Sequence, residues 1–94
     1  MRKAFVTVAM SETVSIDQLH EVLSEALDFP GWYGKNWDAF WDSINALVEM
    51  PEHLQLIGWR PFAERFPQDA AMMKKCLDDM SNELPALAAI VDYS

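Results

Sequence analysis

The segment 32–42, WYGKNWDAFWD, places large aromatic side chains among two aspartates, a lysine and a glycine. Asp38 and Asp42 stand four residues apart, so on a helix their like charges are neighbours and weaken the helix slightly. Two such carboxylates could act as an acid and a base, or bind a hard cation. Aromatic side chains beside fixed charges are also typical of a protein-binding hot spot. The segment is therefore the first candidate for a functional site.

The catalytic and metal-binding hypotheses find little support elsewhere in the chain. Asp38 and Asp42 fall on a convex helix face without a third convergent ligand. His20 and His53 have no second histidine or cysteine at a zinc-binding spacing, so both are expected in structural or surface roles. Cys76 is expected to be a semi-buried small hydrophobe, and the glycines form no phosphate-binding run. We expect no enzyme activity, no cofactor and no metal.

Helix-capping signals define the elements that must position this segment. Ser15, followed three residues later by a glutamine, fits a capping box and predicts a helix to about Leu27. A Pro-Gly pair and a further glycine then break the chain. Asn36 is a good N-cap residue, and it predicts a second helix to about Val48. The candidate segment thus spans a loop and the helix that follows it.

The remaining segments alternate between strand and helix patterns. Residues 3–10 predict a largely buried first strand, and residues 53–59 predict a short second strand. A helical turn at 60–66 and a long helix at 68–84 precede a final strand within 85–93. Strands separated by helices imply parallel crossovers. We predict an α/β fold in two layers, with a three-stranded parallel sheet packed against helices, in one domain spanning residues 1–94.

The second predicted helix has two faces of different character. At about 100° per residue, its acidic stripe is separate from its apolar arc, and Trp41 lies between them. Trp32 and Tyr33 precede the helix in a glycine-flanked turn, where a large aromatic side chain is hard to bury. An acidic stripe is ordinarily only a solvated face, so the pattern alone leaves both interpretations open. The stripe consists of Asp38, Asp42, Asn45 and Glu49, and the arc of Trp37, Phe40, Ile44, Leu47 and Val48.

Two other helices carry apolar stripes that are expected to face the core. On the first helix these residues are Ile16, Leu19, Val22, Leu23, Ala26 and Leu27, and on the long helix they are Met72, Met73, Leu77 and Met80.

Composition restricts the class of partner. The 94 residues include 15 acidic and 7 basic side chains, for a formal net charge of −8. This charge opposes binding to nucleic acid or to an anionic membrane and favours a basic protein partner. The single cysteine cannot form an intramolecular disulfide, and no segment has the pattern of a signal peptide or a spanning helix. We therefore expect a cytoplasmic protein.

The motif YGKNWDAFWD at 33–42, with a proline upstream and VEMP downstream, closely resembles the signature of the barstar family. Barstar is an intracellular protein inhibitor of a guanyl-preferring bacterial ribonuclease. The resemblance covers nearly the whole chain, from the first strand to the closing apolar strand. It implies that the motif helix and its preceding loop plug the nuclease active site, with acidic side chains where substrate phosphates would bind.

The resemblance also implies roles for individual residues. Asp42 matches the central aspartate, Asp38 the flanking one, and Trp41 the aromatic beside them. Two departures concern the partner: Trp32 stands where barstar has a tyrosine, and Leu47 where it has a tryptophan. The other implied contacts are Tyr33, Gly34 and Asn36 in the loop, and Asp78 or Asp79 on the long helix, with Asp79 favoured.

Three classes of function follow from these observations. The first is an inhibitor that forms a one-to-one complex with a basic ribonuclease, either one the cell secretes or a nuclease toxin, in which case the chain is an immunity protein. The second is an acidic adaptor or regulatory module for another basic protein, and the third is a small acid-base or metal-dependent enzyme. We favour the inhibitor, monomeric when free, with no direct contact to nucleic acid or membrane.

Overall fold

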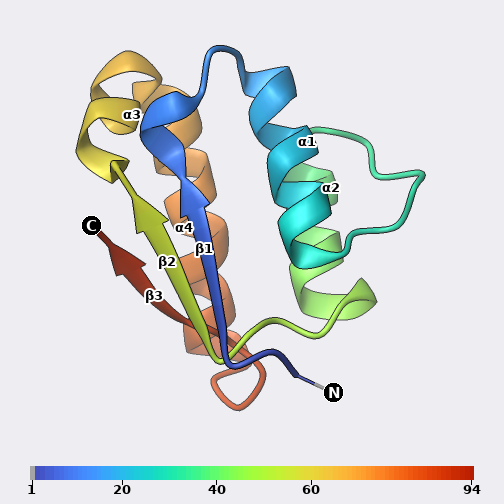
Figure 1. The fold of residues 1–94 in the computed structure, drawn as a ribbon. Helices are drawn as coiled ribbons and strands as arrows, with labels where there is room; N and C mark the ends of the chain where they lie inside the picture. Colours follow the sequence, from blue (N-terminus) through green and yellow to red (C-terminus); the bar gives the residue numbers. More distant parts are fainter. Residues whose placement is uncertain (1) are drawn as a thin grey trace.

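The computed structural model describes residues 2–94 and has the predicted α/β architecture, with a parallel sheet on one side and helices on the other (Figure 1). The strands are β1 (Phe5–Ala9), β2 (His53–Ile57) and β3 (Ile90–Tyr93). The helices are α1 (Ile16–Leu27), α2 (Trp37–Asp42), α3 (Trp59–Arg65) and α4 (Pro67–Glu83), with a 3₁₀ turn η1 (Met10–Glu12) and a π-helical turn η2 (Ser43–Leu47). The predicted two-layer fold is confirmed.

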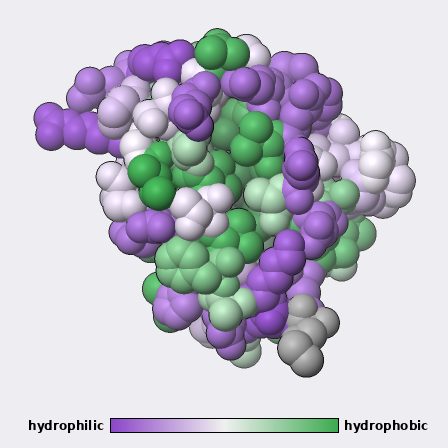
Figure 2. All heavy atoms as spheres, viewed as in Figure 1, coloured by the Kyte–Doolittle hydropathy of each residue, from purple (hydrophilic) through white to green (hydrophobic). Residues whose placement is uncertain are grey.

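The sheet has the strand order β1-β2-β3, and only one of its faces is covered. Leu54 and Leu56 of the central strand are fully buried beneath the helices, together with Val8 of β1. Phe5, at the edge of the other face, is 57% exposed, and Figure 2 shows hydrophobic side chains gathered over the strands on this side. The prediction of a largely buried first strand is wrong, because successive side chains point to opposite faces and helices cover only one.

The α1 helix begins as predicted. The Ser15 hydroxyl accepts a hydrogen bond from the Gln18 backbone at 3.1 Å, and the Gln18 side chain accepts one from the Val14 backbone at 2.9 Å. The helix ends at Asp28, which has a left-handed conformation with φ of 59°. Leu19, Leu23 and Leu27 are buried as expected, whereas Val22 is 41% exposed and was wrongly predicted in the core.

The long helix α4 packs beneath the sheet through one face. Met73, Leu77 and Met80 are buried there, as predicted. Met72 is 45% exposed, which corrects its predicted place in the core. Adjacent residues on a helix point about 100° apart, so Met72 and Met73 cannot both face the sheet. Met72 instead faces α2.

Arg2 ties the start of the chain to two distant loops. Its guanidinium donates hydrogen bonds to five backbone carbonyls, in the segment before β2 and in the turn between α4 and β3. That turn occupies most of the predicted final strand, because β3 itself begins only at Ile90. The five acceptors are the carbonyls of Met50, Pro51, Ala86, Leu87 and Ala88.

Candidate functional site

The loop before α2 buries two aromatic side chains and exposes a third. Trp32 is 73% exposed, as expected of a binding residue. The ring of Tyr33 is buried, with its centroid 4.8 Å from that of Phe29. The expectation that Tyr33 is hard to bury is therefore wrong, because Phe29 and α1 provide the cover. The loop is anchored by Phe29 and Tyr33, and Trp32 projects from it.

A buried hydrogen bond connects this loop to α1. The Tyr33 hydroxyl lies 2.6 Å from Nδ1 of His20, and the His20 ring also packs against Trp37. Burial lowers the pKa of His20, which favours the neutral imidazole, whose Nδ1 can accept a hydrogen bond from the hydroxyl. Burial also raises the pKa of Tyr33, so the hydroxyl stays protonated. His20 thus has a structural role, as the sequence indicated.

The loop is held at its surface by an ion pair. Lys35 has a positive φ of 53°, and its ammonium lies 2.7 Å from Glu21 and 3.8 Å from Asp17 on α1. The pKa of Lys35 is raised, first by its hydrogen bond to Glu21. The only cation of the candidate segment is therefore turned toward α1, away from the aspartates of α2.

Asn36 caps the first turn of α2, as predicted. Its side-chain oxygen accepts a hydrogen bond from the Ala39 backbone at 2.7 Å, and its amide donates to the Gly34 carbonyl at 3.2 Å. A Cβ added at Gly34 would lie 3.3 Å from the Asn36 amide and 3.4 Å from the Ala39 Cβ. Gly34 and Asn36 therefore set the close approach of the loop to the helix.

The α2 helix exposes its carboxylates and buries its aromatic face. Asp38 and Asp42 are exposed, Trp41 is half-buried, and Trp37 and Phe40 are in the core. Within residues 2–94, neither aspartate lies at ion-pair distance from a cation. The Trp37 indole donates to Asp69 of α4 at 2.9 Å and so joins the two helices. The two carboxylates are presented to solvent by a rigid support.

The π-helical turn η2 changes the helix phase after Asp42. The Val48 backbone bonds to the Ser43 carbonyl at 3.1 Å, five residues back. This hydrogen bond encloses one more residue than that of an α-helix, so the side chains that follow are rotated about the helix axis. Leu47, predicted in the apolar arc, is 46% exposed as a result. Asn45 is half-buried, and its side chain donates to the Trp41 carbonyl. Glu49 lies beyond the end of η2 and lines a different hollow. The acidic stripe of the helix is thus formed by Asp38 and Asp42, without Asn45 or Glu49.

An open groove of about 410 Å³ separates α2 from α4 beside these carboxylates. Asp79 lines the groove and Asp78 does not, so the two candidates on the long helix have different surroundings. Asp78 pairs with Lys74, whose ammonium lies 5.4 Å from the ring centroid of Tyr93 on β3. The groove is lined by Trp37, Asp38, Trp41, Met72, Lys75, Cys76, Asp79 and Glu83. Most of the α4 residues in this set were not predicted as site residues, because the periodicity of one helix does not reveal which residues of another helix lie beside it.

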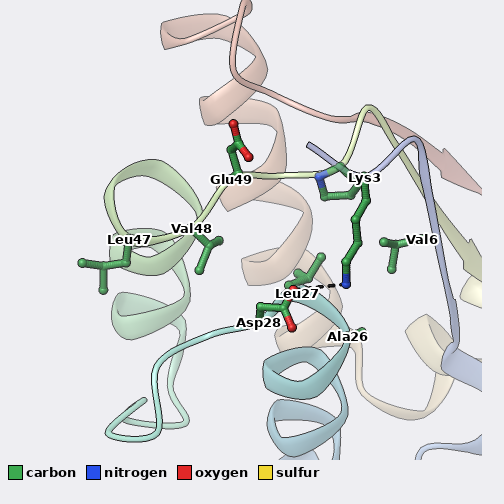
Figure 3. Close-up of a pocket in the computed structure, with 9 residues that line it drawn as sticks. Lys3, Val6, Ala26, Leu27, Asp28, Leu47, Val48 and Glu49 are labelled. Carbon is green, nitrogen blue, oxygen red and sulfur yellow. Dashed lines mark ion pairs between the residues drawn. The ribbon is translucent and has the colours of Figure 1, made fainter. Parts of the chain in front are cut away.

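A second hollow lies between β1, the end of α1 and the end of η2 (Figure 3). It holds about 240 Å³, and the Lys3 ammonium forms an ion pair with Asp28 across it at 3.1 Å. Its walls combine the charged residues Lys3, Asp28 and Glu49 with apolar side chains that include Leu47. Because its charges are of both signs, it is not part of the acidic surface.

Among the described residues, the acidic surface holds neither a reactive thiolate nor a group that could bind a metal ion. The Cys76 thiol is buried 3.7 Å from the Trp37 carbonyl, and burial raises its pKa, which disfavours the reactive thiolate. Among residues 2–94, no three His, Cys, Asp or Glu side chains form a group that could hold a metal ion. In the same residues no helix is both long and apolar enough to span a membrane.

Comparison with known proteins relates the chain to a family and to a curated protein. A family model described as "Barstar (barnase inhibitor)" matches residues 3–90. A curated protein of Bacillus subtilis (strain 168), named "Putative ribonuclease inhibitor YrdF", is 39% identical over 56 residues, or 60% of this chain. The match spans 59% of the length of that relative.

Proposed function

The chain belongs to the barstar family, and from this premise we propose that it inhibits a basic ribonuclease by covering the nuclease active site. The contact surface of this proposal consists of the loop around Trp32, the exposed face of α2 and Asp79 on α4. The observation that carries it is the pair of exposed carboxylates, Asp38 and Asp42, which lack an internal cation among the described residues. They imitate two phosphates of the RNA backbone.

Preorganisation makes this surface suitable for tight binding. The aspartates stand on a helix whose start is capped by Asn36 and whose aromatic face is buried. Little conformational freedom is therefore lost when the partner binds. Tyr33 and Gly34 shape the loop, while Trp32 and Trp41 supply rigid aromatic contact area. Aromatic anchors surrounded by charge are the usual source of binding energy at such an interface.

The partner is a protein whose active site binds anions. The net charge of −8 favours its approach and opposes direct contact with RNA. Trp32 differs from the residue expected for barstar, and as an exposed aromatic of the contact surface it helps to select the partner. Leu47 also differs, but it lines the second hollow. A nuclease toxin would make the chain an immunity protein.

Inhibition titration tests this function directly. Purified basic ribonucleases, with barnase as the first, are mixed with increasing amounts of the protein while cleavage of a fluorescent RNA is followed. We expect cleavage to stop at one inhibitor per enzyme and to recover when excess RNA competes for the active site. Recovery by pull-down of a basic protein without nuclease activity would contradict the inhibitor function and favour the adaptor.

A further inference from the structure

The α4 helix carries two equivalent ion pairs that face different surroundings. Lys74 pairs with Asp78 and Lys75 with Asp79, both four residues apart and both with an N–O distance of 2.6 Å. Only the second pair lines the groove between α2 and α4. Lys74 lies toward Tyr93 of β3 instead. Lys74 and Lys75 therefore form the same kind of ion pair, but only Lys75 lines the groove.

Lys75 is the only cation that lines this groove among the described residues. The carboxylates of Asp38, Asp79 and Glu83 line the same groove, and Trp41 contributes an aromatic wall. The Asp79 side chain is 37% exposed, whereas that of Lys75 is 69% exposed. The exposed Lys75 side chain is thus paired with Asp79, the least exposed carboxylate that lines the groove.

We propose that Lys75 determines which partners bind, because its ammonium occupies the place on Asp79 that a partner's cation must take. The inference rests on the proposed inhibitor function and adds a selection step to it. A partner that brings a cation into the groove has to displace Lys75 from Asp79. A partner without such a cation leaves this ion pair closed and gains nothing from Asp79.

The exposure of the pair makes the exchange feasible. Exposed ion pairs contribute little to stability, so the Lys75–Asp79 pair opens at small cost. The displaced ammonium can swing into water on its flexible stem. A partner cation that reaches both Asp38 and Asp79 replaces one ionic contact with two. A cation that reaches Asp79 alone gains no contact over Lys75. The internal lysine therefore discriminates by the position of the partner's charge.

The test compares Lys75→Met with Lys74→Met. Methionine keeps most of the apolar stem and removes the charge, so both variants change the net charge equally. Two probes are used: barnase, followed by inhibition, and a capped triarginine peptide, followed by NMR shifts of groove residues at low salt. We expect Lys75→Met to bind the peptide about two- to five-fold more tightly than Lys74→Met does, a change typical of releasing an exposed ion pair.

The outcomes separate this inference from the proposed function. Equal affinities of the two variants for the peptide would reduce the effect to net charge and overturn the role of Lys75. If Lys75→Met binds the peptide more tightly but no variant inhibits any ribonuclease, the selection step stands and the inhibitor function fails. If the unchanged protein and both variants inhibit barnase equally and bind the peptide equally, the inhibitor function stands and the role of Lys75 is contradicted. Urea unfolding confirms that both variants are folded.

Discussion

Asp42 lies exposed at the end of α2, four residues after Asp38, where like-charge repulsion and poor helix propensity oppose the helix. We expect Asp42→Ala to leave the free energy of unfolding unchanged or to raise it by about a few tenths of a kcal/mol. If the proposed nuclease is the partner, the substitution should leave several of its cations unpaired and cost about 2 to 5 kcal/mol of affinity, a general range that the barnase–barstar pair itself helped to define.

Urea unfolding and inhibition titration measure both effects of Asp42→Ala on one protein. Asp92→Ala is the control, because it removes the same charge from the uncovered face of the sheet. A variant at Asp42 that unfolds more easily yet inhibits normally would return this aspartate to the solvated face of an ordinary amphipathic helix.

Trp32 and Phe29 lie in the same loop with opposite exposures. We expect Trp32→Ala to weaken binding by about 2 kcal/mol with no change in the unfolding midpoint, because the side chain contacts solvent. Phe29→Ala should instead destabilise the fold by about 3 kcal/mol, since it removes a buried aromatic ring. Calorimetric binding and thermal melts give both values, and a large loss of stability in Trp32→Ala would place that residue in the core.

The burial of His20 beside Tyr33 predicts a dependence of stability on pH. Burial lowers the pKa of His20 below its ordinary 6.5, against the opposing charges of Asp69 and Asp17. The unfolded chain therefore binds the proton more tightly, and the free energy of unfolding falls as pH drops through 6.5 toward the folded pKa. Urea unfolding from about pH 7.5 to 5 should show this slope, above the range where most carboxylates titrate. His20→Gln should remove it, and an unchanged slope would contradict the assignment.

Local periodicity predicts exposure correctly where the neighbours on the same helix decide it. Asp38 and Asp42 are exposed as the 3.6-residue period indicates. Met72 is wrongly predicted because its neighbour Met73 takes the face toward the sheet. Tyr33 is wrongly predicted because a residue distant in sequence helps to bury it. His20, thirteen residues earlier, accepts the Tyr33 hydroxyl, and no spacing within the loop reveals that contact. The choice of Asp79 over Asp78 rests on the resemblance alone and stays a prediction, although Asp79 is the one of the two that lines the groove.

At the scale of elements, two helices begin with the same kind of cap but have different functions. Asn36 caps α2, which carries the candidate site, and Ser15 caps α1, which supports it. Replacing either residue with alanine should cost about 1 kcal/mol of stability. Only Asn36→Ala should also weaken inhibition, because its amide fixes the loop at Gly34. If Asn36→Ala and Ser15→Ala inhibit equally when the same fraction of each protein is folded, the separate role of Asn36 in binding is contradicted.

Capping residues made the starts of α1 and α2 predictable because the signal lies within four residues. The π-helical turn η2 was not predictable, since SINAL is compatible with continued α-helix and only the packed structure selects the wider turn. The exposure of β1 also escaped prediction. A valine-rich strand has the same composition whether helices cover one face or both. Element types are therefore encoded locally, and their faces depend on the packing of the whole chain.

At the scale of the whole molecule, the net charge of −8 should determine the rate of association. Attraction to a basic nuclease is screened over about 8 to 10 Å at physiological salt. We expect the association rate to fall markedly between low and high salt, while the dissociation rate changes less. Stopped-flow tryptophan fluorescence, to which the exposed Trp32 contributes, measures both rates. An association rate that is independent of salt would contradict electrostatic steering.

The uncovered face of the sheet makes this protein simple to derivatise. Thr7 and Gln55 lie side by side there, joined by a hydrogen bond of 3.3 Å, on the face that the helices leave uncovered. The single native thiol, Cys76, is buried with a raised pKa and should react slowly with maleimides. A Thr7→Cys variant would therefore accept a fluorophore or a surface tether at one site. The acidic groove and Trp32 would remain free for the partner.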